Sequence, residues 1–399
     1  MKYIAKMMLA LLASVTLVIP AYAWDFSASG TMETTFNSTS TKTDSDADTA
    51  TSGGVSSTGK SLTLKSSNTD GDHTSSFSYV ADWDGNLDQT ITVSGSKKVG
   101  KWTGSANVSY NIDQPGCVDN NTNSAATAGC AGQTGEDRGA ITLTDGTMTI
   151  VMGEAAHLAN QNVSSGSSAG GQTGMDAADA DLGIGAMVGS FHGISAGYKV
   201  SDTISVTGAY QTTGDQNDLL GAMDFADGET AVYGTTGMGV SASIGAGPAT
   251  IGITVGNAST KDNSGAGGSL KTTASAMGLG VAIDLGDIKP WLSYGSNSIK
   301  GSETEGQKTY GGMDFGLTYA MGSDKIIVYV GNLEEKISKD DKPDTYSMME
   351  LGYATTVGPA SLNIGYGTKS GADGDGTATD RSGDGYSYTD IDVTMSLSF

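Results

Sequence analysis

The five residues from Gly193 to Gly197, GISAG, match the G-x-S-x-G pattern around the nucleophile of esterases, and His192 stands beside them. In those enzymes the serine sits on a strained turn between a strand and a helix, and its histidine and acid come from elsewhere. Here Ser195 lies within FHGISAGYKV (191–200), where apolar and polar residues alternate as in a strand. We therefore expect Ser195 not to be catalytic, and the protein not to be an enzyme.

Residues that could bind metal ions are few and poorly spaced. His73, His157 and His192 are the only histidines, and they lack the i, i+4 or cysteine pairing of zinc sites. The stretches DGD (70–72) and GADGDGTATDRSGDG (371–385) resemble calcium loops, but neither completes an EF-hand with its closing glutamate. We interpret both as solvated outer loops, with a weak divalent-cation bridge as the alternative. We expect no cofactor.

Cys117 and Cys130 are the only cysteines, and both lie in the polar stretch PGCVDNNTNSAATAGC. Two thiols are too few for a zinc site. In an exported protein they would meet an oxidising compartment, so a disulfide that closes a loop is favoured over two free thiols.

The start of the chain predicts export. Lys2 and Lys6 precede an uncharged apolar run from Met7 to Ile19, and Ala-Tyr-Ala follows, which is typical of a signal peptidase site. This predicts a signal peptide at 1–23 and a mature domain at 24–399. The alternative is a membrane anchor, but the run is shorter than the roughly 20 residues of a helical span.

The charge balance excludes nucleic acid as a partner. Without Lys2 and Lys6 the chain has 21 − 2 = 19 basic and 44 acidic residues, a formal charge of 19 − 44 = −25. Phosphate backbones bind proteins with the opposite charge. Arg138 and Arg381 are the only arginines, so bidentate capture of phosphate or carboxylate is poorly supplied.

The elements that must hold these residues are predicted to be strands. Apolar residues recur at every second position, which gives one apolar and one polar face. The clearest runs are 24–36, 77–83, 87–93, 102–110 and YTDIDVTMSLSF at 388–399. We expect the last run to pair with the first and close a barrel, because closure removes open strand edges. Phe399 would then lie on the apolar face.

Two kinds of connection separate these runs. Short turns are predicted at 144–146, 201–203, 245–248, 284–287, 322–325 and 357–360. Long loops rich in Gly, Ser, Asn and Asp are predicted at 39–58, 111–137, 154–181, 213–229, 258–271, 296–307, 334–344 and 369–385. This layout is typical of an all-β transmembrane antiparallel β-barrel, with short periplasmic turns and long extracellular loops.

The strand count is predicted as 16 to 18. Our 19 candidate strands exceed that range, and a single-chain barrel needs an even number of strands. The segment 182–191 could be a strand or the end of a loop. Barrel strands need about 9 to 11 residues. Aromatic residues near run ends would form interfacial girdles; they are Trp83, Trp102, Tyr294, Tyr319, Tyr366 and Tyr388.

At this point the chain resembles the Gram-negative general porins, which are trimeric outer-membrane channels. The likeness rests on the signal peptide, the hairpin GAITLTDGTMTIVMGEA (139–155), the segment 191–200 and the terminal Phe399. The resemblance implies that 154–181 is a constriction loop folded into the barrel, although an ordinary external loop remains the alternative. It also implies that Phe399 and the closing strand with Tyr388 are read by the barrel-assembly machinery.

The expected function is therefore passive diffusion of small hydrophilic solutes and ions across the outer membrane. Porins of this family carry arginines opposite the acidic third loop, and this chain has almost none. An acidic constriction concentrates cations, so we expect cation preference. The constriction residues would be Glu154, His157, Asp176, Asp179 and Asp181. The alternatives are a substrate-specific channel with a saturable site and a soluble exported β-protein. Expected partners are outer-membrane lipid, lipopolysaccharide and two further copies of the chain.

Overall fold

The chain forms one antiparallel sheet of 18 strands. The computed structural model describes residues 24–43, 49–83, 87–111, 138–156, 190–211, 233–262, 271–300, 307–336, 343–372 and 386–399. In those ranges no helix is long and apolar enough to cross a bilayer. The strands are β1 (Asp25–Thr43), β2 (Ala50–Asp70), β3 (His73–Trp83), β4 (Leu87–Val99), β5 (Trp102–Asn111), β6 (Arg138–Thr144), β7 (Met148–Ala156), β8 (Ser190–Ser201), β9 (Ile204–Gln211), β10 (Tyr233–Ala246), β11 (Ala249–Asp262), β12 (Lys271–Ile283), β13 (Ile288–Lys300), β14 (Gln307–Met321), β15 (Asp324–Lys336), β16 (Asp344–Val357), β17 (Ala360–Ala372) and β18 (Tyr386–Ser398).

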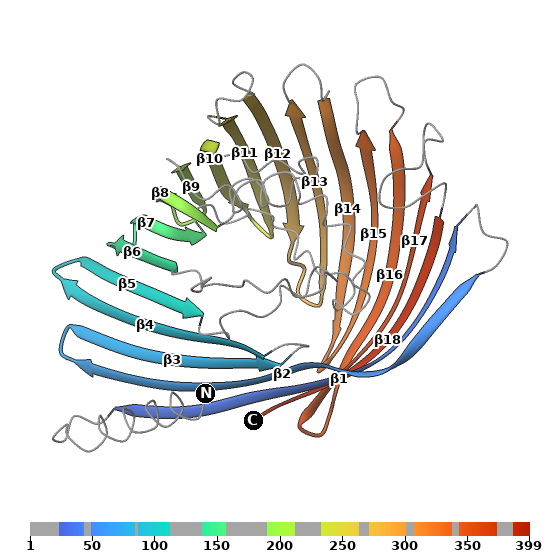
Figure 1. Ribbon diagram of the computed structural model, residues 1–399, viewed down its shortest axis with the longest axis horizontal. Helices are drawn as coiled ribbons and strands as arrows, with labels where there is room; N and C mark the ends of the chain where they lie inside the picture. Colours follow the sequence, from blue (N-terminus) through green and yellow to red (C-terminus); the bar gives the residue numbers. More distant parts are fainter. Residues whose placement is uncertain are drawn as a thin grey trace, which may run out of the picture.

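The sheet closes on itself. Each strand pairs with the next along the chain, and β18 pairs with β1 from Thr31↔Ser398 to Thr43↔Tyr386. Beyond this ladder, Gly30 and Phe399 exchange both backbone hydrogen bonds, at 2.8 and 3.0 Å. In Figure 1, β2 to β5 and β11 to β17 form separate walls, and β1 and β18 run side by side where these walls meet. The predicted barrel, its strand count and its closing seam are confirmed.

One end of the barrel carries only short turns within the described chain. Links of two to four residues join β2–β3, β4–β5, β6–β7, β8–β9, β10–β11, β12–β13, β14–β15 and β16–β17. All six predicted short turns are confirmed. Glycines at positive φ serve five of these six, for example Gly146 (φ 87°) between β6 and β7, because side chains are strained there. The predicted loop DGD at 70–72 is wrong, since it forms the tight β2–β3 turn at this end.

The opposite end carries the longer connections, but several begin later than predicted. The predicted loop at 39–58 is largely strand, because β1 continues to Thr43 and β2 begins at Ala50. Hydroxyl pairs hold these polar strand ends, such as Thr39 Oγ1 to Ser52 Oγ at 2.6 Å. Strands of 19 and 21 residues also exceed the expected 9 to 11. These strands continue past the apolar band because backbone pairing alone holds a strand outside the membrane, and such a strand does not need an apolar face.

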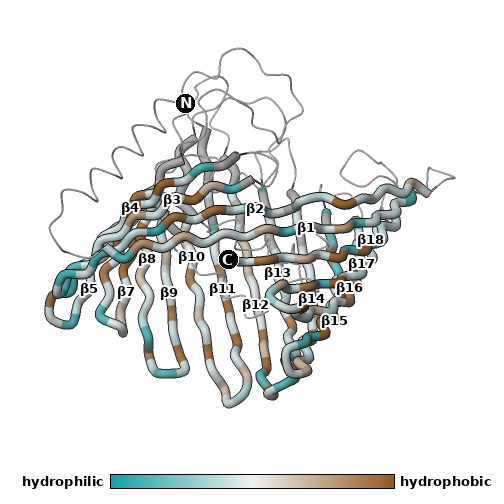
Figure 2. The backbone as a smooth tube through the Cα atoms, turned by 90° about the horizontal axis from the view of Figure 1, so that it is seen from below, coloured by the Kyte–Doolittle hydropathy of each residue, from teal (hydrophilic) through white to brown (hydrophobic). Residues whose placement is uncertain are grey.

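The two faces of the sheet differ in chemistry. Large apolar side chains lie exposed on one face of almost every strand, among them Phe36 on β1, Val93 on β4, Met238 on β10 and Leu351 on β16. Figure 2 shows hydrophobic residues spread along the strands and hydrophilic residues at several turns. In a closed barrel the exposed apolar face is the outer one. The alternate residues, mainly Ser, Thr, Gly and Asp, face the interior.

Candidate functional site: the inner wall

The inner wall over β13 to β18 and β1 carries four buried carboxylates. Asp314, Glu350, Asp390 and Asp392 have exposed fractions of 0 to 2%. Their strand neighbours, such as Phe315, Leu351 and Ile391, are exposed apolar residues of the outer face. Because successive side chains of a strand alternate between faces, the four carboxylates share the inner face. We call them the acidic wall.

Asp390 and Asp392 lie at the seam that closes the barrel. Register places Asn37 of β1 opposite Asp392 of β18. The Asn37 Nδ2 donates to Oδ1 of Asp390 and to Oδ1 of Asp392, at 2.7 Å each. Thr35 and Thr394 add a buried hydroxyl pair at 2.8 Å. One amide therefore holds two carboxylates at positions i and i+2 of the same strand.

Asp314 of β14 accepts hydrogen bonds from the strands on both sides of it. Tyr329 of β15 donates its hydroxyl to Oδ1 at 3.0 Å, and Ser293 of β13 donates to Oδ2 at 3.3 Å. Hydrogen bonds to a charged acceptor contribute more than neutral ones. Tyr329 is fully buried, so its hydroxyl needs such a partner.

Glu350 lies between the two other parts of the acidic wall. It pairs with Tyr329 of β15 on one side and with Gly367 of β17 on the other, and Gly367 pairs with Asp390. Lys369, two residues beyond Gly367, therefore shares the inner face. Its Nζ lies 5.5 Å from the ring centroid of Tyr346. Lys369 thus lies beside the four carboxylates, and Lys289 of β13 and Lys325 of β15 have the same inward parity nearer the short turns.

A buried aromatic cluster packs beside Asp314. Trp291 and Tyr329 have ring centroids 5.8 Å apart, and Leu333, Tyr346 and Met348 complete the cluster. The neighbouring inner positions are small, since register places Gly316 between Trp291 and Tyr329. A Cβ at residue 316 would overlap the Trp291 ring. The large rings are thus accommodated over glycine on the curved inner face.

Most residues predicted for the constriction are not in the described part of the chain. His157, Asp176, Asp179 and Asp181 lie outside it, as do Cys117 and Cys130. Glu154 is on β7, where its backbone pairs with His192 of β8. The structure therefore leaves the constriction loop and the disulfide as predictions.

The two predicted closure residues, Tyr388 and Phe399, have different positions. Phe399 is 73% exposed, and its ring lies over Gly30, where a Cβ would stand 2.6 Å from the ring. Tyr388 has the same parity as Asp390 and donates its hydroxyl to Asp390 Oδ2 at 3.4 Å. Its assignment to an interfacial girdle was wrong, because even-numbered residues of β18 face inward. Tyr294, Tyr319 and Tyr366 do lie exposed on the outer face.

Ser195 and the acidic turn residues show no catalytic or metal-binding arrangement in the described chain. Ser195 is 5% exposed in mid-β8, paired with Val151 and Ala209, and not on an elbow. No described group of three or more His, Cys, Asp or Glu could hold a metal ion. The acidic wall is the principal concentration of charge that sequence reasoning missed. Its signal was available in DID (390–392), where two acids alternate with an apolar residue.

No family model and no curated protein matches the sequence. Solved structures match over nearly the whole chain. An anion-selective porin from Comamonas acidovorans has a TM-score of 0.53 at 13% identity, covering 94% of this chain and 100% of its own. The outer-membrane channel DcaP of Acinetobacter baumannii has a TM-score of 0.53 at 12% identity, with 95% and 98% covered. OmpT of Vibrio cholerae, in a trimer form, has 0.52 at 10% identity, with 94% and 100% covered. The chain has a porin-like barrel fold.

Proposed function

We propose that this porin-like barrel is a channel in the outer membrane of a Gram-negative bacterium. The exposed apolar face meets lipid, and every strand has a hydrogen-bonded neighbour on both sides, so no backbone edge is left in the hydrocarbon. The polar inner face lines water. Small hydrophilic solutes and ions cross by passive diffusion, without a cofactor and without catalysis. The fold of the porins and of DcaP supports this proposal.

The channel prefers cations, and the acidic wall is the observation that carries this. Four buried carboxylates and the ammonium of Lys369 give this stretch of inner wall an excess of acidic groups. In a low-dielectric wall such charges act over longer distances than in water. Cations are concentrated and anions repelled. The Comamonas neighbour is an anion-selective porin, so fold alone does not set the sign.

The remaining parts of the proposal come from the sequence. Residues 1–23 are a signal peptide, and the mature barrel is 24–399. The connection that follows β7, predicted from the sequence as loop 154–181, narrows the lumen; Glu154 lies near the end of β7, and His157, Asp176, Asp179 and Asp181 complete the constriction. Cys117 and Cys130 form a disulfide in an external loop. The barrel is a homotrimer, assembled by machinery that reads the closing strand and Phe399.

Reversal potentials in planar bilayers under a potassium chloride gradient test the function. The wild type should show potassium preference, and the double variant Asp390→Asn/Asp392→Asn should shift the potential toward zero, because two inner charges are lost. Glu334→Gln is the matched control, since Glu334 lies exposed on the outer face and its loss should change nothing. Chloride preference, or equal shifts in both variants, would exclude the acidic wall as the determinant. Saturable current block by one solute would instead identify a substrate-specific channel.

A further inference from the structure

The first half of β2 pairs with a neighbouring strand on only one side. Register joins β2 to β1 from Thr41↔Ala50 onward, but β2 meets β3 only from Ser61↔Asp82. In Figure 1, β2 accordingly continues beside β1 well beyond the end of β3. Half of the backbone N–H and C=O groups of an edge strand point away from its single partner. We call residues 50–56 of β2 the open edge.

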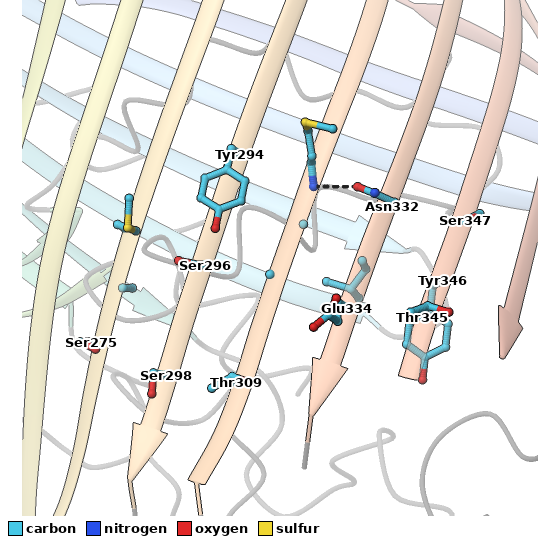
Figure 3. A pocket seen from close by; sticks show the side chains of 16 residues that line it. Ser275, Tyr294, Ser296, Ser298, Thr309, Asn332, Glu334, Thr345, Tyr346 and Ser347 are labelled. Carbon is cyan, nitrogen blue, oxygen red and sulfur yellow. Dashed lines mark hydrogen bonds between the residues drawn. The ribbon is translucent and has the colours of Figure 1, made fainter. Parts of the chain in front are cut away.

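The other described strands are paired much more completely at the long-connection end. For example, β13 and β14 pair up to Lys300↔Gln307, the last residue of one strand and the first of the next. Figure 3 shows part of this wall, where strands lie side by side and the Met313 N–H donates to Asn332 Oδ1 at 3.2 Å. Among the described strands at this end, the next longest stretch without a second partner is 233–236 of β10. The open edge is therefore a particular feature of β2.

The open edge lacks the features that protect exposed strand edges in natural sheets, which are lysine, proline, bulges or a covering element. Its residues are all exposed, so no described element covers them. The sequence ATSGGVS (50–56) contains no charged residue and no proline, although 16% of the chain is charged. The register shift between β1 and β2, at Glu33/Thr35, lies beyond its end. The open edge is thus available to a further strand.

The open edge also lies beyond the apolar band of the outer face. Phe36 of β1 pairs with Val55 of β2, and both side chains are exposed on that face. The next outward residues toward the long connection are Ser38 and Gly53, and no large apolar residue follows in either described strand. With the long connections outside the cell, the open edge is in water there. The inference below rests on that proposed orientation.

We propose that the open edge binds an extended peptide segment of another protein, which adds to β2 as an antiparallel strand. Backbone hydrogen bonds supply the affinity in this mode of recognition, and alternate side chains supply the selectivity. Val55 is 72% exposed, so an apolar or β-branched residue opposite it would cover an exposed apolar side chain. The open edge is uncharged within a strongly acidic protein, which favours a segment with basic flanks.

A second copy of the chain is the competing occupant, and the membrane disfavours it. Two barrels inserted in the same orientation have their β2 strands running in the same direction, so two open edges could meet only as parallel strands. The outer face of one β2 would then continue into the inner face of the other, and Val55 and Phe36 would meet polar residues. A separate peptide has no such constraint, because it can take the antiparallel direction and place its apolar residues on the outer face.

The test uses a labelled synthetic peptide in which alternating threonine and valine are flanked by lysines. Fluorescence anisotropy measures its binding to the full barrel in alkyl maltoside micelles. A control peptide keeps the flanks but has two prolines in its core, so it lacks backbone donors there and should bind at least about tenfold more weakly. Hydrogen–deuterium exchange of the complex should slow in 50–56 and stay unchanged in 366–371 of β17, which is paired on both sides.

Two variants, Gly54→Pro and Val55→Pro, test the same site from the protein side. Neighbouring residues of an antiparallel strand donate their N–H groups to opposite sides, so one of the two prolines removes a donor of the open edge and leaves the pairing with β1 intact. That variant should keep the wild-type gel mobility and bind the peptide about tenfold more weakly or worse. Gly54→Ala is the control and should bind as the wild type does, since a Cβ there has no neighbour within 4 Å.

Equal binding of the two peptides, unchanged binding in both proline variants, or protection outside 50–56 would each overturn the inference. Protection of 50–56 that grows with protein concentration in the absence of peptide would also overturn it, and would assign the open edge to a second copy. Conductance is measured separately on the same samples. A barrel that binds the peptide without conducting ions contradicts only the channel proposal, and a conducting barrel that does not bind it contradicts only this inference.

Discussion

At the scale of the residue, the inner wall combines large side chains with glycines. Trp291 and Tyr329 lie on either side of Gly316, and Glu350 and Asp390 lie on either side of Gly367. Glycine weakens an isolated strand, because it has more backbone freedom to lose on folding. Here it provides the space that an inward ring or carboxylate needs on a concave surface. The composition of 59 glycines is therefore partly a packing requirement.

Replacement of Gly316 by alanine should destabilise the barrel. The new Cβ would overlap the Trp291 ring, which is packed on Tyr329 and cannot move freely. We expect a loss of about 1 to 3 kcal/mol in unfolding free energy. Urea titration of the folded fraction, followed by heat-modifiable gel mobility, measures it. Gly311→Ala on the same strand has its nearest atom at 4.0 Å and should stay within about 1 kcal/mol of the wild type; equal losses would contradict the packing argument.

At this scale the sequence predicted which face of the sheet a residue occupies, but not which residues meet at the site. The alternation in YTDIDVTMSLSF places Asp390 and Asp392 on the polar face without any structure. Their meeting with Asn37 depends on a seam between residues more than 350 positions apart, as does the link between Thr35 and Thr394. Asp314 and Glu350 needed the register of β13 to β17 as well. Local pattern determines which face a residue occupies, whereas register determines its neighbours.

At the scale of the element, turn chemistry was predictable and strand ends were not. Gly, Asp and Pro mark the short turns because those turns need positive φ or a fixed φ. The long-connection ends are rich in Ser and Thr and lose the apolar alternation, so sequence placed loops where β1 and β2 still pair. For β8, the strand begins at Ser190, and the ambiguous residues before it lie outside the described part.

The turn between β6 and β7 provides a prediction about pH. Asp145 accepts from the backbone N–H of Met148 at 2.7 Å and of Thr147 at 2.9 Å, and its other oxygen accepts from Lys101 at 2.9 Å. The Met148 hydrogen bond, then Lys101, then Thr147 lower the pKa of Asp145 from 3.8 to about 2. A lowered folded-state pKa gives stability that is present above the unfolded value and is lost as pH falls through the folded value.

The variant Asp145→Asn should therefore flatten the dependence of the urea midpoint on pH between about 4 and about 2. Lys101→Met should flatten it only in part, because the backbone donors of Thr147 and Met148 remain. Midpoints recorded from about pH 5 downward for the three proteins check the order. An unchanged slope in Asp145→Asn would show that this turn does not contribute to acid sensitivity.

At the scale of the whole molecule, the barrel separates two environments by a single layer of backbone. Outer residues such as Val93 are exposed and apolar, whereas the next residue on either side faces inward. The barrel architecture could be predicted from the recurrence of apolar residues at every second position. A chain of such alternating strands without long apolar runs has few ways to bury one face in lipid. Which solute passes does not follow from that pattern.

Cysteine labelling tests this sidedness. In a Cys117→Ser/Cys130→Ser background, Thr92→Cys should react with a membrane-impermeant maleimide in proteoliposomes, because the inner face is wetted. Val93→Cys should react far more slowly, since its side chain would be in lipid. In alkyl maltoside with excess reagent after unfolding, both should label fully, which checks that each thiol is present. Faster labelling at residue 93 would place the apolar face in water.

The seam between β1 and β18 also sets an order of events. β1 finds β2 soon after both are exported, but its other edge waits until sixteen further strands have been delivered. The backbone contact from Gly30 to Phe399 spans 399 − 30 = 369 residues, so closing this seam carries the largest loop-closure cost in the wall. Until then two open edges persist, and each can pair with a neighbouring chain. Completion of the barrel is thus a late, all-or-none event, and a chaperone or assembly factor acts best by holding the edge of β1 until β18 arrives.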